Sequence, residues 1–267
     1  MHPVLISHMA WQESFPHVVA PLPDEWLPGL LLRCDEVNRW SSGTTSGYLL
    51  GSTKLKGFGP RSHWIVVPSP LLERLTQVVR LPQERLLATT YQAELARLYG
   101  LLSPYGRLLT TKPSFHLCPA CVTQSRLLKR TLMLPHLNAC PLHAIELQNR
   151  CQCGVPLVPF SRSALPFTCL ACGLDWAHLP QLQLSVDRVV RERHLGLLYE
   201  FFLVKGTPGL RDCAWEILRM HERATSTVRL RRSHKYARPY GSRVSLEYLV
   251  EQMVNAGFSS TDILTYW

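Results

Sequence analysis

The 267-residue sequence lacks several features that would assign it to common classes of protein. No apolar run approaches the ~20 residues that a membrane-spanning helix needs. Residues 1–20 contain His2, His8, Glu13 and His17 and lack the apolar core of a secretory signal peptide. Acidic residues are scarce, with 19 Asp and Glu against 29 Lys and Arg. We therefore expect a cytoplasmic protein with a basic surface and no membrane partner.

Patterns typical of enzymes are also missing. The sequence has no H-E-x-x-H pair, no cluster of carboxylates and no glycine-rich loop that could cradle a phosphate. Four scattered histidines are expected at the surface or behind metal ligands: His63, His116, His136 and His178. We therefore expect no catalytic residues and no enzymatic activity.

What the sequence does have is a concentration of cysteine. Seven of its nine cysteines lie within 55 positions, in the patterns C-x2-C-x18-C-x2-H and C-x-C-x15-C-x2-C. Each pattern offers two short ligand pairs separated by a loop of the length that zinc sites use. We call them the first cluster (Cys118, Cys121, Cys140 and His143) and the second cluster (Cys151, Cys153, Cys169 and Cys172). They predict two tetrahedral Zn²⁺ ions per chain.

The residues beside the ligands fit tight metal-binding turns. Pro119 and Pro141 stiffen two of the turns, while Gly154 and Gly173 follow cysteines where a left-handed backbone is often needed. Four protein ligands leave no open position on the metal, whereas catalytic zinc keeps one for water or substrate. Both sites are therefore predicted to be structural.

Two other uses of the cysteines are weaker. Disulfides would need an oxidising compartment, and no signal peptide leads there. A redox dithiol at Cys118 and Cys121 would leave the other cysteines of the two clusters unexplained. Cys34 and Cys213 lie outside the clusters on apolar helical faces, and we expect them to be buried free thiols.

Periodic apolar residues predict a helical module over residues 21–111, after a lead-in at 1–20. The first helix should begin with Asp24 as N-cap and bury the i, i+3, i+4, i+7 series Leu27, Leu30, Leu31 and Cys34. A short helix should hold residues 48–50, another should start at Ser69–Pro70, and a fourth should run from Pro82 through Tyr91. Short helices joined by tight turns are typical of a helix-turn-helix-like domain.

Helical periodicity returns after the tandem zinc-finger unit, which we place at residues 112–180. One long helix is predicted with the apolar residues Val186, Val189, Val190, His194, Leu197, Leu198 and Phe201. Two shorter helices should follow, one over 212–220 and one from Ser245 to Gly257, and residues 259–267 should begin another. The sequence thus predicts a mainly α-helical fold with small zinc-stapled modules: an N-terminal helix-turn-helix-like domain, tandem zinc fingers and a C-terminal helical domain over 181–267.

The positive charge is concentrated in a basic stretch, residues 219–243. It contains a single acid, Glu222, and the aromatic residues Tyr236 and Tyr240. Such a stretch can follow a phosphate backbone and stack on bases, but it can equally be a solvated linker or face an acidic protein. The candidate nucleic-acid-binding residues are Arg219, Arg223, Arg229, Arg231, Arg232, Lys235, Arg238 and Arg243.

Three segments of the chain together resemble the TniQ family. They are PLPDEWLPGLLLR, RLPQERLLATTY and LCPACVTQSRLLKRTLMLPHLNACPLHAIELQNRCQCG. The third resembles the family's order of C-P-x-C, C-P-x-H and C-x-C-G. The resemblance implies that the first and second clusters match the family's two zinc fingers, and it covers roughly residues 21–172.

The resemblance also implies a function. Members of this family are target-selection adaptors in bacterial transposition that connect a target site to the AAA+ regulator TnsC, which then recruits the transposase. Longer TnsD-like members read DNA through an extended C-terminal region, and short ones accompany CRISPR effectors in RNA-guided transposons. Because the chain ends soon after Cys172, we expect the CRISPR-associated type, acting with guide RNA and target DNA at the nucleoid. An autonomous zinc-finger DNA-binding protein, either TnsD-like or a transcription factor, is the alternative.

An adaptor needs exposed aromatic anchors for its partners. The large aromatics of the helical module are Trp26, Trp40, Tyr48 and Trp64. Each is a candidate partner-binding residue if it lies at the surface and a core residue if it does not.

Overall fold

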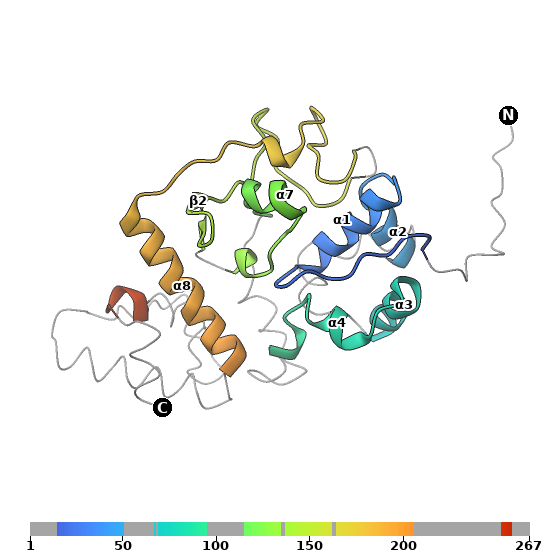
Figure 1. Cartoon of the computed structure of the whole chain (residues 1–267), viewed down its shortest axis with the longest axis horizontal. Coiled ribbons are helices and arrows are strands. Elements are labelled where there is room, and N and C mark those ends of the chain that lie inside the picture. Colours follow the sequence, from blue (N-terminus) through green and yellow to red (C-terminus); the bar gives the residue numbers. More distant parts are fainter. Residues whose placement is uncertain are drawn as a thin grey trace, which may run out of the picture.

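The computed structural model of the chain describes residues 15–50, 67, 69–94, 115–134, 137–161, 164–205 and 252–257. This part is mainly helical, as predicted from the sequence. Its elements, labelled in Figure 1, are α1 (Leu27–Val37), α2 (Thr44–Leu50), α3 (Ser69–Val79), α4 (Gln83–Leu87), α7 (Pro119–Ser125), η1 (Thr131–Met133), β1 (Ala139–Cys140), β2 (Ile145–Glu146), η2 (Trp176–His178) and α8 (Val186–Lys205).

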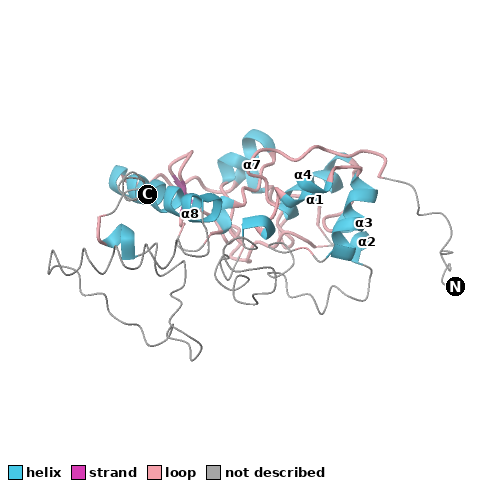
Figure 2. Cartoon of the chain, turned by 90° about the horizontal axis from the view of Figure 1, so that it is seen from below, coloured by secondary structure: helices cyan, strands magenta, loops and turns pink. Residues whose placement is uncertain are grey.

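The elements lie in three groups along the long axis of the molecule. Helices α1 to α4 gather at one end and α8 lies at the other, with α7 and the short strands between them (Figures 1 and 2). None of the described helices combines the length and the apolar character needed to cross a bilayer.

Helix α1 begins later than the sequence suggested. Trp26 is its N-cap and Pro28 lies in its first turn, where the missing N–H costs nothing. The prediction that Asp24 caps the helix is wrong, because Asp24 adopts a left-handed φ of 57° and its carboxylate instead accepts a hydrogen bond from Thr131 Oγ1 at 2.5 Å. A residue that looks like a cap from its position therefore ties the helical module to the finger unit.

The apolar face predicted for α1 is buried. Leu27, Leu30 and Leu31 are fully enclosed in one core with residues of α3 and α4, including Leu72, Leu75, Val79 and Leu86. Cys34 is also buried, and burial raises the pKa of its thiol to about 11, as expected for an inert free cysteine.

A buried carboxylate sets the turn from α1 into α2. Asp35 is fully enclosed and accepts hydrogen bonds from the backbone N–H groups of Gly43 and Thr45, both at 2.7 Å. Burial raises the pKa of Asp35 despite these bonds. The carboxylate satisfies amides at the start of α2 that have no partner within the helix.

Helix α3 begins at Ser69, the residue that the sequence predicted as its N-cap, whereas α4 ends at Leu87 and does not reach Tyr91. The hydroxyls of Thr89 and Thr90 bond back to the carbonyls of Leu86 and Leu87, at 2.7 and 2.8 Å, and such bonds compete with helical continuation. The four helices occur in the predicted order. Their arrangement as a helix-turn-helix stays a prediction.

The finger unit contains little regular structure, as predicted. β1 and β2 form one antiparallel pair in which Ala139 faces Glu146 and Cys140 faces Ile145. Two further cores lie here, each built around the ligands of one cluster. The first contains Leu132, Ile145 and Leu147 with Cys118, Cys121 and Cys140; the second contains Leu32, Leu117, Val122, Leu128, Leu157, Phe167, Trp176 and Leu179 with Cys151 and Cys169.

The helical module and the finger unit pack directly on one another. Backbone hydrogen bonds cross between them, from Trp26 N to Leu128 O at 2.8 Å and in the bridge between Glu25 and Lys129. Gly29 permits the close approach, because a Cβ there would lie 3.0 Å from the Cβ of Leu128.

A row of aromatic rings continues this junction. Trp26 stacks on Phe115 with centroids 6.0 Å apart, Phe115 lies 5.5 Å from Trp176, and Trp176 meets Phe167 edge to face at 5.9 Å. The row leads from the core of the helical module into the core around the second cluster. Aromatic packing of this kind holds two units in a fixed relation.

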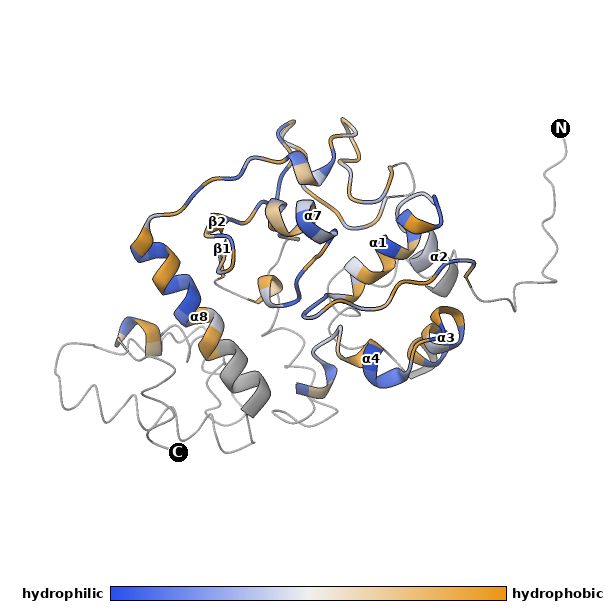
Figure 3. Cartoon of the chain, in the orientation of Figure 1, coloured by the Kyte–Doolittle hydropathy of each residue, from blue (hydrophilic) through white to orange (hydrophobic). Residues whose placement is uncertain are grey.

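The long C-terminal helix is present as α8, but its buried face differs from our prediction. Val186, Val190 and Leu197 are exposed, at 78%, 46% and 42%. Among residues 186–198, whose side chains the structure describes, the buried positions are Glu192, Leu195 and Leu198, of which Leu198 was predicted, and the helix packs on β1. The side chain of Phe201, also predicted on the apolar face, lies outside the described residues. The carboxylate of Glu192 is buried because it accepts a hydrogen bond from Asn138 N at 2.8 Å. Hydrophobic and hydrophilic positions consequently mix along α8 (Figure 3).

Residues 252–257 show the predicted end of the helix that was expected to start at Ser245; the further helix expected at 259–267 lies outside the described residues. Gly257 has a φ of +81° and donates its N–H to Val254 O, while Met253 is buried. The predicted helix at 212–220, with Cys213, and the basic stretch lie outside the described residues.

Candidate metal centres

The four ligands of the first cluster come from two turns. Cys118 is the N-cap of α7 and Cys121 lies in its first turn, with Pro119 at the first helical position. Cys140 ends β1, and His143 lies in the hairpin before β2, where Ala144 takes a left-handed φ of 56°. The antiparallel pair and the start of α7 thus bring two ligand pairs together across a separation of 18 intervening residues.

Distances within the first cluster match one tetrahedral ion. His143 Nδ1 lies 3.3, 3.4 and 3.5 Å from the sulfurs of Cys118, Cys121 and Cys140, and the Cys121 and Cys140 sulfurs are 3.9 Å apart. A tetrahedral zinc with Zn–S bonds of about 2.3 Å would hold sulfurs about 3.8 Å apart and a sulfur and a nitrogen about 3.6 Å apart. The side chains therefore fit zinc without rearrangement.

A side chain outside the cluster orients the imidazole ring of His143. Its Nε2 lies 3.0 Å from Oε1 of Gln124 on α7. If Nε2 carries the proton and donates it to Gln124, Nδ1 is left free to bind a metal, which is the usual role of the residue behind a metal-binding histidine. Gln124 was not singled out from the sequence, because its contact depends on how α7 meets the hairpin.

The second cluster has the same geometry with four sulfurs. Cys151 Sγ lies 3.5 Å from Cys172 Sγ, and Cys153 Sγ lies 3.6 Å from Cys169 Sγ. All four sulfurs lie within 4.8 Å of one another. The turns close through Gly154 and Gly173, whose φ values of +84° and +73° confirm the left-handed positions predicted for them.

The crowded sulfurs of the first cluster share negative charge unevenly: hydrogen bonds with Cys118 and Cys121 lower the pKa of Cys140, while that of Cys121 is raised. The eight described cysteines are all free thiols, so the described structure gives no support to disulfides. Hydrogen bonds with Cys118 and then Cys140, followed by burial, raise the pKa of Cys121, because neighbouring thiolates repel one another without a compensating charge. A bound dication would reverse this preference and deprotonate the sulfurs. Each cluster can therefore hold one metal ion.

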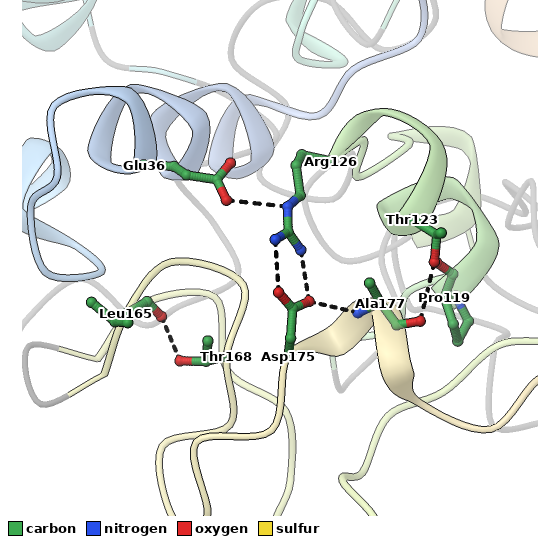
Figure 4. Close-up of polar contacts among 8 residues, drawn as sticks. All are labelled: Glu36, Pro119, Thr123, Arg126, Leu165, Thr168, Asp175 and Ala177. Atoms are coloured by element: carbon green, nitrogen blue, oxygen red, sulfur yellow. Dashed lines mark hydrogen bonds and ion pairs between the residues drawn. The ribbon is translucent and has the colours of Figure 1, made fainter.

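An arginine clamp joins the two clusters to the helical module (Figure 4). Arg126 ends α7 with a left-handed φ of 53° and forms a bidentate ion pair with Asp175 at 2.6 and 2.7 Å. Its Nε also meets Glu36 on α1 at 3.1 Å. Burial is the largest single influence on Asp175 and opposes its ionisation, but the hydrogen bonds from Arg126 and from the N–H of Ala177, together with the charge of Arg126, hold the pKa of Asp175 below its usual value.

The clamp fixes three elements at once. Asp175 also caps η2 by accepting the N–H of Ala177 at 2.8 Å, and Thr123 Oγ1 on α7 donates to Ala177 O at 3.1 Å (Figure 4). The 3-10 helix η2, which follows the last ligand of the second cluster, is thereby held against α7, the helix of the first finger. Sequence reasoning missed Arg126, since only a left-handed residue after α7 can direct this side chain toward both Glu36 and Asp175.

The candidate partner-binding residues divide by burial. Trp26 is 5% exposed and belongs to the core, so the structure places it with the core residues. Trp40 is partly buried against the same core and meets Phe15 edge to face at 5.2 Å. The side chain of Tyr48, all of Trp64 and the basic stretch Arg219–Arg243 lie outside the described residues.

Comparison with known protein families gives a match over the helical module and the first finger. The model of the TniQ family matches residues 16–147, which include α1 to α4, α7 and the whole first cluster. No curated protein matches the chain.

Proposed function

This chain belongs to the TniQ family, and we propose that it is a target-selection adaptor that links a target-recognition complex to an AAA+ regulator during transposition. Family membership associates the chain with transposition in an adaptor or DNA-binding role. The finer proposal is that the recognition complex is a CRISPR effector with its guide RNA, bound to target DNA, and that the regulator is a TnsC-like ATPase that recruits the transposase.

The observation that carries the proposal is the pairing of the family match with two closed four-ligand clusters. We propose that each cluster holds one Zn²⁺, which would crosslink turns that contain little regular secondary structure. A zinc ion with four protein ligands supplies rigidity and has no open coordination position for a substrate, so these sites suit a protein that acts by contact. The packing of α1 on the finger unit would present both as one rigid surface.

Exposed leucines at the tips of the fingers support a contact function. Leu142 lies between Cys140 and His143 and is 65% exposed, and Leu170 lies between Cys169 and Cys172 and is 43% exposed. Apolar side chains fixed on rigid turns make good anchors for a protein partner. We add them to Trp40, Tyr48 and Trp64 as proposed partner-binding residues.

Capture of the ATPase tests the adaptor proposal. Full-length protein should retain a TnsC-like ATPase in a pull-down with ATP and DNA, and Leu142→Ser/Leu170→Ser should lose most of this binding, about tenfold or more. Leu182→Ser is the matched control, since Leu182 is 52% exposed but outside the metal turns. All three proteins should retain their metal. No association of the unaltered chain at micromolar concentration would show that the adaptor mechanism is wrong.

The basic stretch is proposed to follow a nucleic-acid backbone. Reversal of charge at Arg229, Arg231 and Arg232 should weaken binding to DNA or guide RNA and reduce the salt dependence by about one counterion for each phosphate that is no longer neutralised. A control variant reverses three exposed arginines elsewhere, Arg85, Arg191 and Arg193. If the variant with reversed charges at Arg229, Arg231 and Arg232 supports transposition at normal efficiency, the basic stretch is a solvated linker.

The alternative function predicts a different result with the isolated protein. An autonomous zinc-finger DNA-binding protein should retard duplex DNA at physiological salt without other components. An adaptor of the proposed kind should bind DNA strongly only beside the ATPase or the CRISPR complex. A gel-shift experiment on purified protein therefore separates the two.

A further inference from the structure

The two clusters share a geometry but differ in how far they are shielded from solvent. In the first cluster, Cys118, Cys121 and Cys140 are each at most 2% exposed. In the second cluster, Cys153 and Cys172 are both exposed, and only Cys151 and Cys169 are buried. Two of the four cysteines of the second cluster therefore lie at the surface.

The surroundings reinforce this contrast. The first cluster is enclosed by Leu132, Ile145 and Leu147, and α8 packs on β1 beside it. The tips of the second cluster are open, because a Cβ placed at Gly154 or Gly173 would find no heavy atom within 4 Å. The loops that carry the second cluster project at the edge of the molecule in Figure 1.

We propose that the second cluster is a labile, oxidant-sensitive metal site, with Cys153 and Cys172 as its reactive thiolates, while the first cluster is a permanent structural site. The inference rests on the zinc occupancy proposed above. Zinc-bound thiolates remain nucleophiles, and their reaction with oxidants depends on access. The three cysteines of the first cluster can undergo the same reaction, but their burial denies an oxidant that access.

The oxidation is a two-electron reaction with a peroxide. The thiolate of Cys153 attacks one peroxide oxygen, forming a sulfenic acid and releasing hydroxide. The thiolate of Cys169, whose sulfur lies 3.6 Å away, then attacks the sulfenic sulfur, forms the disulfide and releases a second hydroxide. Two thiolates are oxidised, one peroxide is reduced, and Zn²⁺ leaves because two ligands are lost. Cys172 and Cys151 form an equivalent pair at 3.5 Å.

Loss of the second zinc ion should also affect the packing of the helical module. Cys151 and Cys169 belong to the same core as Phe167, Trp176 and Leu32, the last of which comes from α1. Release of the second ion should therefore loosen the junction between α1 and the finger unit and leave the first finger intact. Oxidation would then weaken the proposed adaptor surface reversibly.

Metal release from the full-length, zinc-loaded protein tests the inference. Hydrogen peroxide is added in small portions, free zinc is followed with a chromogenic chelator, and oxidised cysteines are mapped by alkylation and mass spectrometry. We expect one zinc ion per chain to leave at least about tenfold faster than the other. The disulfides should be confined to the second cluster. Thiol reductant with added zinc should restore the lost ion.

Two ligand variants show which cluster gives the fast phase of zinc release and which gives the slow phase. Cys153→Ser should abolish the fast phase and keep the slow one, whereas Cys118→Ser should do the reverse. If a variant fails to fold, the lability of each zinc ion can still be measured on the unaltered chain, by following zinc release into excess EDTA without oxidant. Release of both ions at one rate, or earlier oxidation of Cys118, Cys121 or Cys140, would overturn the inference. Protein purified with fewer than two zinc ions would instead overturn the proposed occupancy.

Discussion

Cys140→Ser should lose one zinc ion per chain and unfold the first finger. Cys140 is fully buried at the end of β1, and its sulfur lies within 4 Å of both Cys121 and His143. Because structural zinc contributes about 10 kcal/mol or more to the folding of zinc-finger peptides, the finger should not survive without its ion. Elemental analysis should fall from two zinc ions to one, and residues around the cluster should lose hydrogen-exchange protection.

Cys34→Ala provides the matched control. Cys34 is equally buried but lies on α1, outside both clusters, so this variant should lose about 1 kcal/mol of stability and keep both ions. Two zinc ions in Cys140→Ser, or the same loss of zinc in both variants, would mean that the four residues of the first cluster do not act as a metal site.

The ligand clusters could be predicted from sequence because their information is local. Cys118 and Cys121 need only a tight turn to reach one ion, and the same holds for Cys169 and Cys172. The left-handed backbone of Gly154 and Gly173 was predictable because it too is a local property: each glycine closes the tight turn of the cysteine that precedes it. The structure brings together all eight ligands that the spacing indicated.

Features that depend on tertiary contacts were not predictable in this way. Asp24 has the residue type and position of an N-cap, but Thr131 and Arg130 compete for its carboxylate. Helix α8 carries apolar residues on two faces, and periodicity cannot tell which one meets β1. The buried acid Glu192 selects the face, because its carboxylate accepts the N–H of Asn138. A sequence pattern would normally place that acid in solvent.

The predicted boundary between the helical module and the finger unit is crossed by many contacts. Neighbouring residues on α1 illustrate this: Leu31 belongs to the core of the helical module, whereas Leu32 belongs to the core around the second cluster. Leu132 and Met133 on η1 are divided between cores in the same way. The sequence analysis predicted one buried apolar face on α1, which includes Leu31 but not Leu32. Leu32 is buried as well, because the finger unit covers a second side of the helix.

This division predicts that two equally buried leucines will affect different sites. Leu31→Ala and Leu32→Ala should each cost about 2–5 kcal/mol of stability, since both side chains are fully enclosed. Only Leu32→Ala should speed the release of the second zinc, by about tenfold or more, because it removes packing behind Cys151 and Cys169. Urea unfolding measures the first effect, and zinc release to a chelator under native conditions measures the second.

The comparison between these variants separates local support from general loss of stability. If zinc release merely followed global stability, Leu31→Ala and Leu32→Ala would accelerate it equally. If the helical module and the finger unit were energetically independent, neither would change it. Faster release in Leu32→Ala alone would mean that α1 is part of the second metal site, and that a metal bound at the fingers stabilises the surface that the helical module presents to its partners.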